Sequence, residues 1–173
     1  MPPPVIHQPL KMWTNQDLVL FHGTVQLFAE EIVSGPIHVS KGEPLADFGP
    51  GFYTTTSERQ ARSWANQKAK IRAGTSAALV ELLVPREAIA RLATISFVRG
   101  DADAGDFWSL ILHCRGGGSD HRRMTPNGCY DVVFGPVAKA WYTRRAILAG
   151  MDQVSFHTTA AETVLNGAAR RIL

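Results

Sequence analysis

The sequence predicts an α+β fold with a mainly antiparallel sheet. Short β-branched and aromatic segments are mixed with amphipathic helical segments, without the strict strand–helix–strand alternation of a parallel, doubly wound sheet. No repeat or long linker divides the 173 residues, so one domain is expected over residues 15–173. Residues 1–14 contain three consecutive prolines and are expected to be an extended N-terminal segment.

The composition supports a packed domain and excludes several classes of protein. The chain is 45% hydrophobic and 19% charged, which is enough apolar material for a core and unlike a disordered chain. No apolar run is long enough to span a bilayer, and the N-terminus lacks the apolar centre of a secretory signal, so we expect a cytoplasmic protein without a membrane partner. The net charge of +3 permits an anionic partner without requiring one.

Turn residues and hydrophobic periodicity divide the chain into expected elements. Strands are expected over residues 17–24, 52–56, 76–84, 94–98, 130–137 and 152–158. Helices are expected over residues 25–35, 58–72, 86–93, 104–115, 138–150 and 160–173. Ser57 and Gln60 form an expected capping box at the start of the second helix, which would satisfy two amide groups. Residues 115–128 form a Gly-rich, basic loop that we expect to be mobile.

Three segments place a polar residue on or beside an apolar strand: residues 20–24, 47–56 and 152–158. For any one of them, the ordinary explanation is a strand end whose polar group bonds to nearby protein. His22, however, precedes Gly23, where the missing Cβ lets the backbone approach a ligand, and a neutral imidazole can bond a sugar hydroxyl. Gln153 carries an amide that both accepts and donates. These residues are candidates for a binding site.

Two aromatic residues are candidates for the walls of a flat pocket. Tyr53 follows Gly49 and Gly51, and its ring offers a stacking surface with a polar tip. Trp64 lies eleven residues further along, in the expected helix. If that helix packs back on the strand, Trp64 forms a second ring wall, although a core tryptophan explains it equally well.

These segments, in this order, resemble the H-Y-E branch of the ADP-ribosyltransferases, the group that includes the poly(ADP-ribose) polymerases. They also resemble a bacterial family of unknown function that shares the pattern. The likeness rests on HGT at 22–24, DFGPGFYTTT at 47–56 with the helix that follows, YDVVFGPVA at 130–138 and QVSFHT at 153–158. It implies a split β-sandwich of mostly antiparallel sheets with flanking helices, and NAD⁺ bound between the sheets as a co-substrate.

The resemblance also implies roles for individual residues. His22 resembles the histidine that bonds the adenosine-side ribose, and Gly23 the glycine whose backbone clamps the nicotinamide amide. Tyr53 and Trp64 resemble the two aromatic walls around the nicotinamide. Gln153 stands where the polymerases have a catalytic glutamate, so His22, Tyr53 and Gln153 are the expected catalytic residues. The other residues expected to bind NAD⁺ are Thr24, Gly51, Arg59 and Arg62.

The glutamine at position 153 limits the chemistry that this resemblance implies. Cleavage of the nicotinamide–ribose bond passes through an oxocarbenium-like state, and a glutamate carboxylate stabilises its positive charge. Glutamine keeps the hydrogen bond to the ribose but not the charge. The resemblance therefore implies transfer of a single ADP-ribose rather than a polymer.

The leading hypothesis is a mono-ADP-ribosyltransferase that modifies a protein or a nucleic acid and releases nicotinamide. Relatives of this kind include bacterial toxins and defence effectors, so an antitoxin or immunity partner is a possible companion. One alternative is an NAD⁺ glycohydrolase, in which water is the acceptor. Another, from a different class, is a non-catalytic NAD⁺ or ADP-ribose binding module.

Several other residues suggest weaker alternatives. Arg59 and Arg62 share a helix face and could bind the pyrophosphate of NAD⁺, or form solvated helix surface. The basic loop could bind nucleic acid or pyrophosphate, or be solvated; its residues are Arg115, His121, Arg122 and Arg123. A zinc site from four residues fits no common spacing, so no metal is expected; these residues are His113, Cys114, His121 and Cys129. The two cysteines are expected to be reduced thiols, and Cys114 paired with a histidine is a still weaker candidate nucleophile.

Overall fold

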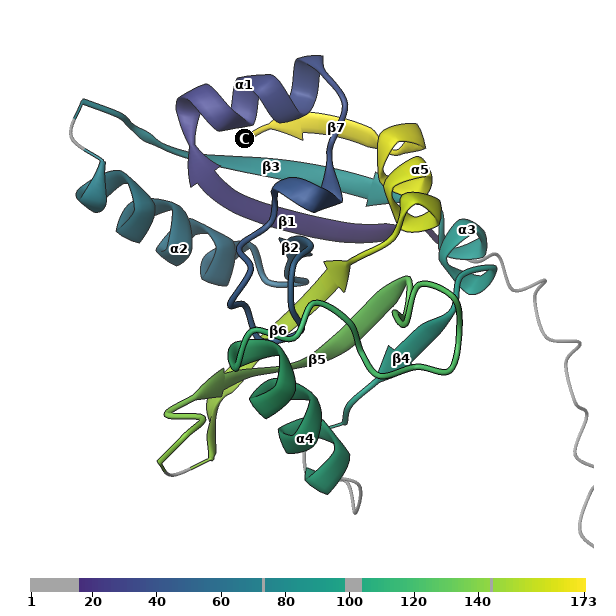
Figure 1. The fold of residues 1–173 in the computed structure, drawn as a ribbon. Helices are drawn as coiled ribbons and strands as arrows, with labels where there is room; N and C mark the ends of the chain where they lie inside the picture. Colours follow the sequence, from purple (N-terminus) through teal and green to yellow (C-terminus); the bar gives the residue numbers. More distant parts are fainter. Residues whose placement is uncertain (1–15, 73, 99–103, 144) are drawn as a thin grey trace, which may run out of the picture.

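The computed structural model describes residues 16–72, 74–98, 104–143 and 145–173, and the expected segment over residues 1–14 lies outside them. The described residues form an α+β fold with two sheets (Figure 1). The strands are β1 (Leu18–Val25), β2 (Phe52–Thr54), β3 (Ala77–Val84), β4 (Thr94–Ser96), β5 (Val132–Lys139), β6 (Ala146–Phe156) and β7 (Ala169–Ile172). The helices are α1 (Gln26–Ser34), the 3₁₀ turn η1 (Val39–Lys41), α2 (Glu58–Ile71), α3 (Arg86–Ala90), α4 (Ala104–Arg115) and α5 (Thr159–Gly167).

The first sheet has the strand order β1-β3-β7 and is antiparallel throughout. Its two faces carry different helices, as Figure 1 shows, with α1 on one side and α2 on the other. Along β1, Leu20 faces the main core with α1 and α5, while Phe21 faces the small cluster under α2. This alternation is the period of two expected of a strand covered on both faces.

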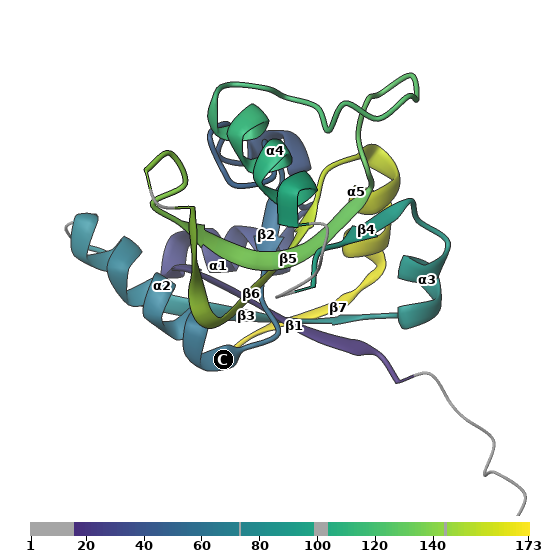
Figure 2. The same cartoon turned by 90° about the horizontal axis from the view of Figure 1, so that it is seen from below.

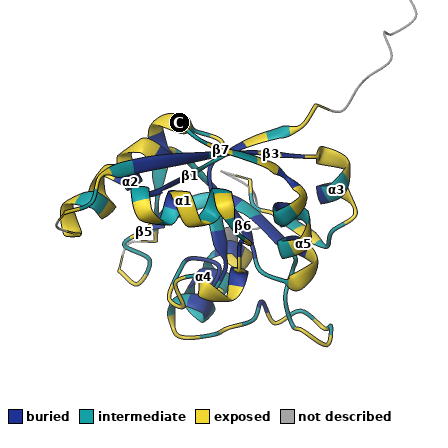
Figure 3. Cartoon of the chain, turned by 90° about the horizontal axis from the view of Figure 1, so that it is seen from above, coloured by how far each residue is buried: buried dark blue, intermediate teal, exposed yellow. Residues whose placement is uncertain are grey.

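The second sheet has the strand order β2-β6-β5-β4, and only its β4–β5 pair is parallel. One face joins the main core through Val154 and Phe156. The other face packs on α4, which lies beside β5 in Figure 2, through Phe107 and Ile111. β3 and the end of β6 are therefore mostly buried, whereas the edge strands β4 and β7 keep exposed residues. Figure 3 shows exposed residues on the outer faces of the helices.

The two sheets are joined where β1 passes the end of β2. Phe21 and Thr55 exchange both backbone hydrogen bonds, at 2.8 and 3.0 Å. One residue further along β1, the side chain of His22 reaches the backbone of Tyr53. The segments that carry His22 and Tyr53 therefore meet at the junction between the sheets, although 31 positions separate them in the sequence.

Of the helices expected from the sequence, one is wrong and another is wrong in part. Residues 138–150 were expected to be helical, but β5 runs to Lys139 and β6 begins at Ala146, with Lys139 paired to Ala146 across the turn. Ala140 and Arg145 have φ of 48° and 47°, which a helix does not allow. The expected helix over residues 160–173 ends at Gly167, and Ala169–Ile172 instead pairs with β3. In both places long-range strand pairing overrides local helix propensity.

The capping box at the start of α2 is only half formed. Ser57 Oγ accepts from the Gln60 amide at 3.3 Å, as expected. The Gln60 side chain does not return to Ser57. Its Nε2 donates to the Asp152 carbonyl at 2.6 Å and its Oε1 accepts from the Asp152 amide at 3.1 Å. Gln60 thus ties the start of α2 to β6.

No helix in the described part of the chain is long and apolar enough to cross a bilayer.

Candidate functional site

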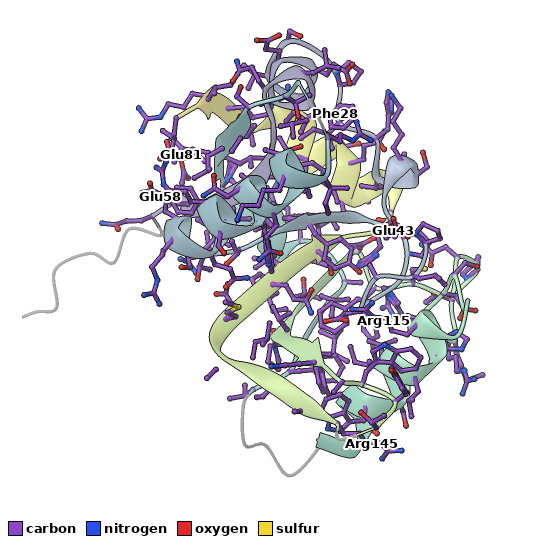
Figure 4. The ribbon with its side chains drawn as sticks, turned by 90° about the vertical axis from the view of Figure 1, so that its left-hand side faces the viewer. Phe28, Glu43, Glu58, Glu81, Arg115 and Arg145 are labelled. Atoms are coloured by element: carbon purple, nitrogen blue, oxygen red, sulfur yellow. The ribbon has the colours of Figure 1, made fainter. Side chains whose placement is uncertain are left out.

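A pocket of about 560 Å³ lies at the junction of the two sheets and is called the main pocket below. Its volume is within the range typical of small-molecule sites. Its walls come from β1, β2, α1, α2 and the segment between α1 and β2. Figure 4 shows Phe28 beside the first sheet and Glu43 at the level where the two sheets meet. The lining residues are His22, Phe28, Glu31, Ile32, Pro36, Ile37, His38, Lys41, Gly42, Glu43, Ala46, Gly51, Phe52, Tyr53 and Lys68.

His22 lines this pocket as a neutral imidazole with a fixed tautomer. Its Nδ1 lies 2.6 Å from the carbonyl oxygen of Tyr53, and its ring stacks on Phe52 with the centroids 4.6 Å apart. A carbonyl only accepts, so Nδ1 carries the proton and Nε2 is an acceptor. Burial, together with the positive charge of Lys68, lowers the pKa of His22 to about 3. At neutral pH the imidazole can therefore accept a hydrogen bond from a ligand hydroxyl.

Lys68 is a pocket residue that the sequence did not reveal as a candidate. Its Nζ donates to the carbonyl of Gly23 at 2.8 Å. Although the residue as a whole is exposed, the inward position of its ammonium group and the charge of Arg72 lower its pKa. Helical spacing could have located it, because positions 61, 65 and 68 share one face, and Ala61 and Ala65 pack on β1.

Gly23 is required by packing between β1 and α2. A Cβ at this position would lie 2.0 Å from the carbonyl oxygen of Ala61, so only glycine allows α2 to approach. The Gly23 carbonyl, expected to clamp an amide of the ligand, already accepts from Lys68. Thr24 is buried and does not line the pocket.

The loop before β2 lines the pocket, and two of its glycines, Gly42 and Gly51, have no room for a side chain. A Cβ at Gly42 would lie 2.1 Å from the Gly51 carbonyl oxygen, and one at Gly51 would lie 2.6 Å from the Phe156 carbonyl oxygen. The Tyr53 hydroxyl holds the same loop, because it donates to the Gly49 carbonyl at 2.7 Å and accepts from the Phe48 amide at 2.9 Å.

The ring of Tyr53 packs in part against residues of the protein core. Successive residues of β2 face opposite sides, so Phe52 packs in the main core and Tyr53 against the cluster under α4. Burial raises the pKa of the Tyr53 phenol well above its ordinary value, which keeps it protonated. Tyr53 lines the pocket, but its ring also supports the second sheet.

Gln153 lies outside the lining of the main pocket, in a buried polar network. It is 4% exposed, and its Nε2 donates to Asp47 Oδ2 at 2.7 Å and to the Pro136 carbonyl at 3.0 Å. Asp47, 3% exposed, also accepts from Arg115 Nε at 2.9 Å and from the Ala138 amide at 2.8 Å. The sequence did not single out Asp47, because a carboxylate in a turn-rich segment is usually solvated.

A second hollow of about 470 Å³ lies beside this network. Gln153 contributes to its lining, together with Thr56, Phe97, Phe134 and Met151. Its residues come from β4, β5, β6 and the start of α2, and it shares none of the residues that line the main pocket. The structure therefore brings His22, Gly51 and Tyr53 to one pocket and places Gln153 in another environment.

Three further candidates on α2 do not line the main pocket: Trp64, Arg59 and Arg62. Arg62 forms an exposed ion pair with Glu58 at 2.6 Å, and Arg59 is exposed. Trp64 is partly buried. Their positions fit helix surface more directly than contact with a ligand in this pocket.

The basic loop is held by contacts within the protein. Arg115 pairs with Asp47, and Arg122 Nε donates to His113 Nδ1 at 3.2 Å. His121 is buried; its Nε2 donates to the Phe48 carbonyl and its Nδ1 accepts from the Tyr130 amide, both at 2.9 Å. The guanidinium of Arg123 lies 4.8 Å from the centroid of Tyr130. These contacts favour a structural role for the loop.

His157 is a further histidine that packs against the basic loop, through His121. Its Nδ1 donates to the Pro50 carbonyl at 2.8 Å, and its Nε2 lies 2.7 Å from Ser155 Oγ. Its ring packs edge-on against His121, with the centroids 4.5 Å apart. Burial, together with the proximity of His121, lowers the pKa of His157 to about 3.

The cysteines and the residues around them do not form a reactive or metal-binding centre in the described part of the chain. Cys114 and Cys129 are free thiols, and burial raises the pKa of Cys114 to about 12, which disfavours the thiolate that a nucleophile requires. No three His, Cys, Asp or Glu side chains of the described residues are placed to share a metal ion.

The fold and the pocket define an α+β protein with a pocket of mixed apolar and polar lining at the junction of two sheets. The chain matches, over residues 18–151, the family described as protein of unknown function (DUF3990), and it belongs to that family. The matched range includes His22, Tyr53 and Lys68 and ends two residues before Gln153. A comparison with curated proteins gave no match for the chain.

Proposed function

We propose that this protein is an NAD⁺-dependent mono-ADP-ribosyltransferase, and that NAD⁺ binds in the pocket lined by His22. The observation that carries the proposal is the neutral imidazole of His22, fixed by the Tyr53 carbonyl, in a pocket of about 560 Å³. Nε2 of this imidazole is an acceptor suited to a ribose hydroxyl, and Lys68 supplies a positive charge for a phosphate.

In the proposed reaction, the bond between nicotinamide nitrogen and the ribose anomeric carbon breaks, and nicotinamide leaves with the bonding electrons. A nucleophilic oxygen or nitrogen of the acceptor, a protein or a nucleic acid, forms the new bond to that carbon and loses its proton. His22 binds the adenosine-side ribose and orients the ligand. With water as the acceptor, the same steps describe an NAD⁺ glycohydrolase.

The environment of Gln153 favours a second candidate, a binding module that holds NAD⁺ or ADP-ribose without cleaving it. Gln153 is 4% exposed, and its Nε2 is already bonded to Asp47 and Pro136. A side chain fixed in this way has little freedom to follow a reacting ribose. The two candidates share the pocket and differ only in whether nicotinamide is released.

The first experiment is isothermal titration of NAD⁺ into the wild-type protein and His22→Ala. Loss of one hydrogen bond to a ligand hydroxyl should weaken binding about tenfold. His113→Ala is the matched control, because it removes an imidazole that lies outside the pocket. Equal affinity of wild type and His22→Ala, with both proteins folded by circular dichroism, would contradict the pocket assignment.

A second measurement separates the candidate functions. The protein is incubated with labelled NAD⁺, with and without cell lysate, and both free nicotinamide and labelled macromolecules are measured. Nicotinamide release together with label in protein or nucleic acid supports transfer, while release without any acceptor indicates a glycohydrolase. Binding without release indicates the module.

A further inference from the structure

A smaller hollow of about 250 Å³ adjoins the main pocket. Its lining consists of Val25, Phe28, Lys68, Ile71 and Arg72. Two of these residues, Phe28 and Lys68, also line the main pocket, so the two hollows lie next to each other on either side of these side chains. A ligand group that reached past Lys68 from the main pocket would enter the hollow lined by Arg72.

This extension has a positive lining. Lys68 and Arg72 lie one turn apart along α2 and its C-cap. Lys68 Nζ donates to the Gly23 carbonyl, and the Arg72 guanidinium lies 4.6 Å from the centroid of Phe28. Within the described part of the chain, neither side chain forms an ion pair with a carboxylate. An ammonium group has three donors and a guanidinium five, so most of this donor capacity is available to an anion.

The helix end alone does not explain this arrangement. Cations are favourable near the C-terminus of a helix, which accounts for basic residues in this turn. Like charges four residues apart, however, destabilise a helix. Lys70, in the same turn, lines neither hollow, whereas the Lys68 ammonium is turned inward against Gly23.

We propose that Lys68 and Arg72 form a phosphate-binding subsite at the outer end of the main pocket, which takes a phosphate monoester carried by the bound nucleotide. This inference rests on the proposed function and refines its substrate: the preferred dinucleotide is the 2′-phosphorylated form, NADP⁺, rather than NAD⁺. The arginine fork bonds two phosphate oxygens, and the lysine adds a point charge at the boundary between the hollows.

The test uses ADP-ribose and 2′-phospho-ADP-ribose, which lack nicotinamide and so are not consumed. Isothermal titration should give about tenfold tighter binding of the phosphorylated ligand to the wild type, the gain expected from charge-assisted hydrogen bonds. Lys68→Gln and Arg72→Gln should each reduce this preference to about twofold or less. Lys70→Gln makes the same charge change in the same helical turn and should keep the preference. If Lys68→Gln does not fold, the preference measured for Arg72→Gln alone tests the subsite.

Equal affinity of the wild type for the two ligands would overturn the subsite, as would an equal loss of preference in Lys70→Gln and Arg72→Gln. If neither nucleotide binds, the proposed function fails, and inorganic phosphate then tests the subsite separately. Saturable binding of phosphate that is lost in Arg72→Gln but kept in Lys70→Gln supports the subsite. Absence of such binding overturns it.

Discussion

The pocket around His22 and the network around Gln153 contrast in how their polar groups are used. In the pocket, Nε2 of His22 and the ammonium of Lys68 keep capacity for a ligand after their bonds within the protein are made. In the network, Asp47 bonds to Gln153, Arg115 and the Ala138 amide, all within the protein. Polar residues on β1 and β6 thus keep free hydrogen-bonding capacity in one place and are used for internal support in the other.

The largest effect should come from removing the centre of the network. Asp47→Ala leaves Gln153 Nε2, the Ala138 amide and Arg115 without their shared acceptor, and should lower the free energy of unfolding by about 3–5 kcal/mol. Urea denaturation measures the change. Glu43→Ala, an acidic residue that lines the pocket, is the control and should cost less than about 0.5 kcal/mol. Similar losses of unfolding free energy in both variants would show that Asp47 does not support the fold more than a pocket residue does.

A smaller effect is expected when the amide of the network becomes a second carboxylate. Gln153→Glu places a negative charge against Asp47 Oδ2, where Nε2 now donates at 2.7 Å, and should cost about 2 kcal/mol. Asp47→Asn combined with Gln153→Glu removes the repulsion between two carboxylates but leaves the Pro136 carbonyl without its donor, so only part of the loss should be recovered in a double-mutant cycle. Additive losses would show that the two side chains are not coupled.

The same double variant also tests whether the side chain at position 153 takes part in nicotinamide release. If Gln153 acts on the ribose as the resemblance implies, nicotinamide release in this variant should be equal to or greater than that of the wild type. Complete loss of release from a folded double variant would indicate that Gln153 serves the reaction in another way.

The smallest expected effect is on the pH dependence of stability, through His22 in the pocket and the buried His157 outside it. Burial lowers the pKa of both histidines to about 3, from the ordinary value of 6.5. Because the unfolded chain binds more protons between these values, their contribution to stability is complete above pH about 6.5 and is lost as the pH falls toward 3. The number of protons taken up on unfolding, obtained from the slope of the unfolding free energy against pH between pH 7 and 4, should fall by up to about one in His22→Gln and in His157→Gln.

A bound ligand should distinguish these two histidines. A ligand hydroxyl that bonds to Nε2 of His22 opposes its protonation further, so NAD⁺ should lower the apparent pKa of His22 and leave that of His157 unchanged. NMR titration of the imidazole signals measures both. An equal response of the two histidines would place the ligand elsewhere.

The sequence predicted the α+β class and the elements whose signals are local. The strand that carries His22, the helix that begins after Ser57, and the strand at Phe52 appear close to their expected positions, because hydrophobic periodicity and caps act over a few residues. Residues 146–150 were expected to end a helix but belong to β6. Their pairing with β5 is tertiary, and no local signal opposed the helical reading strongly enough.

Prediction of the site was limited for the same reason. The sequence brought His22 and Tyr53 forward as candidates, and the structure places both at one pocket. It did not reveal Lys68, whose inward position depends on how α2 packs on Gly23. Nor did it reveal Asp47, whose partners lie 68 and 106 residues away. Contacts of this separation become visible only once the chain is folded.

The contact between Gly42 and Gly51 limits how far the loop that lines the pocket can move. Their backbones touch so closely that a single added methyl group would collide, and the Tyr53 hydroxyl fastens the same loop at Phe48 and Gly49. Movement of this loop would break those contacts, so the part of the pocket that it lines is expected to keep its shape whether or not a ligand is bound.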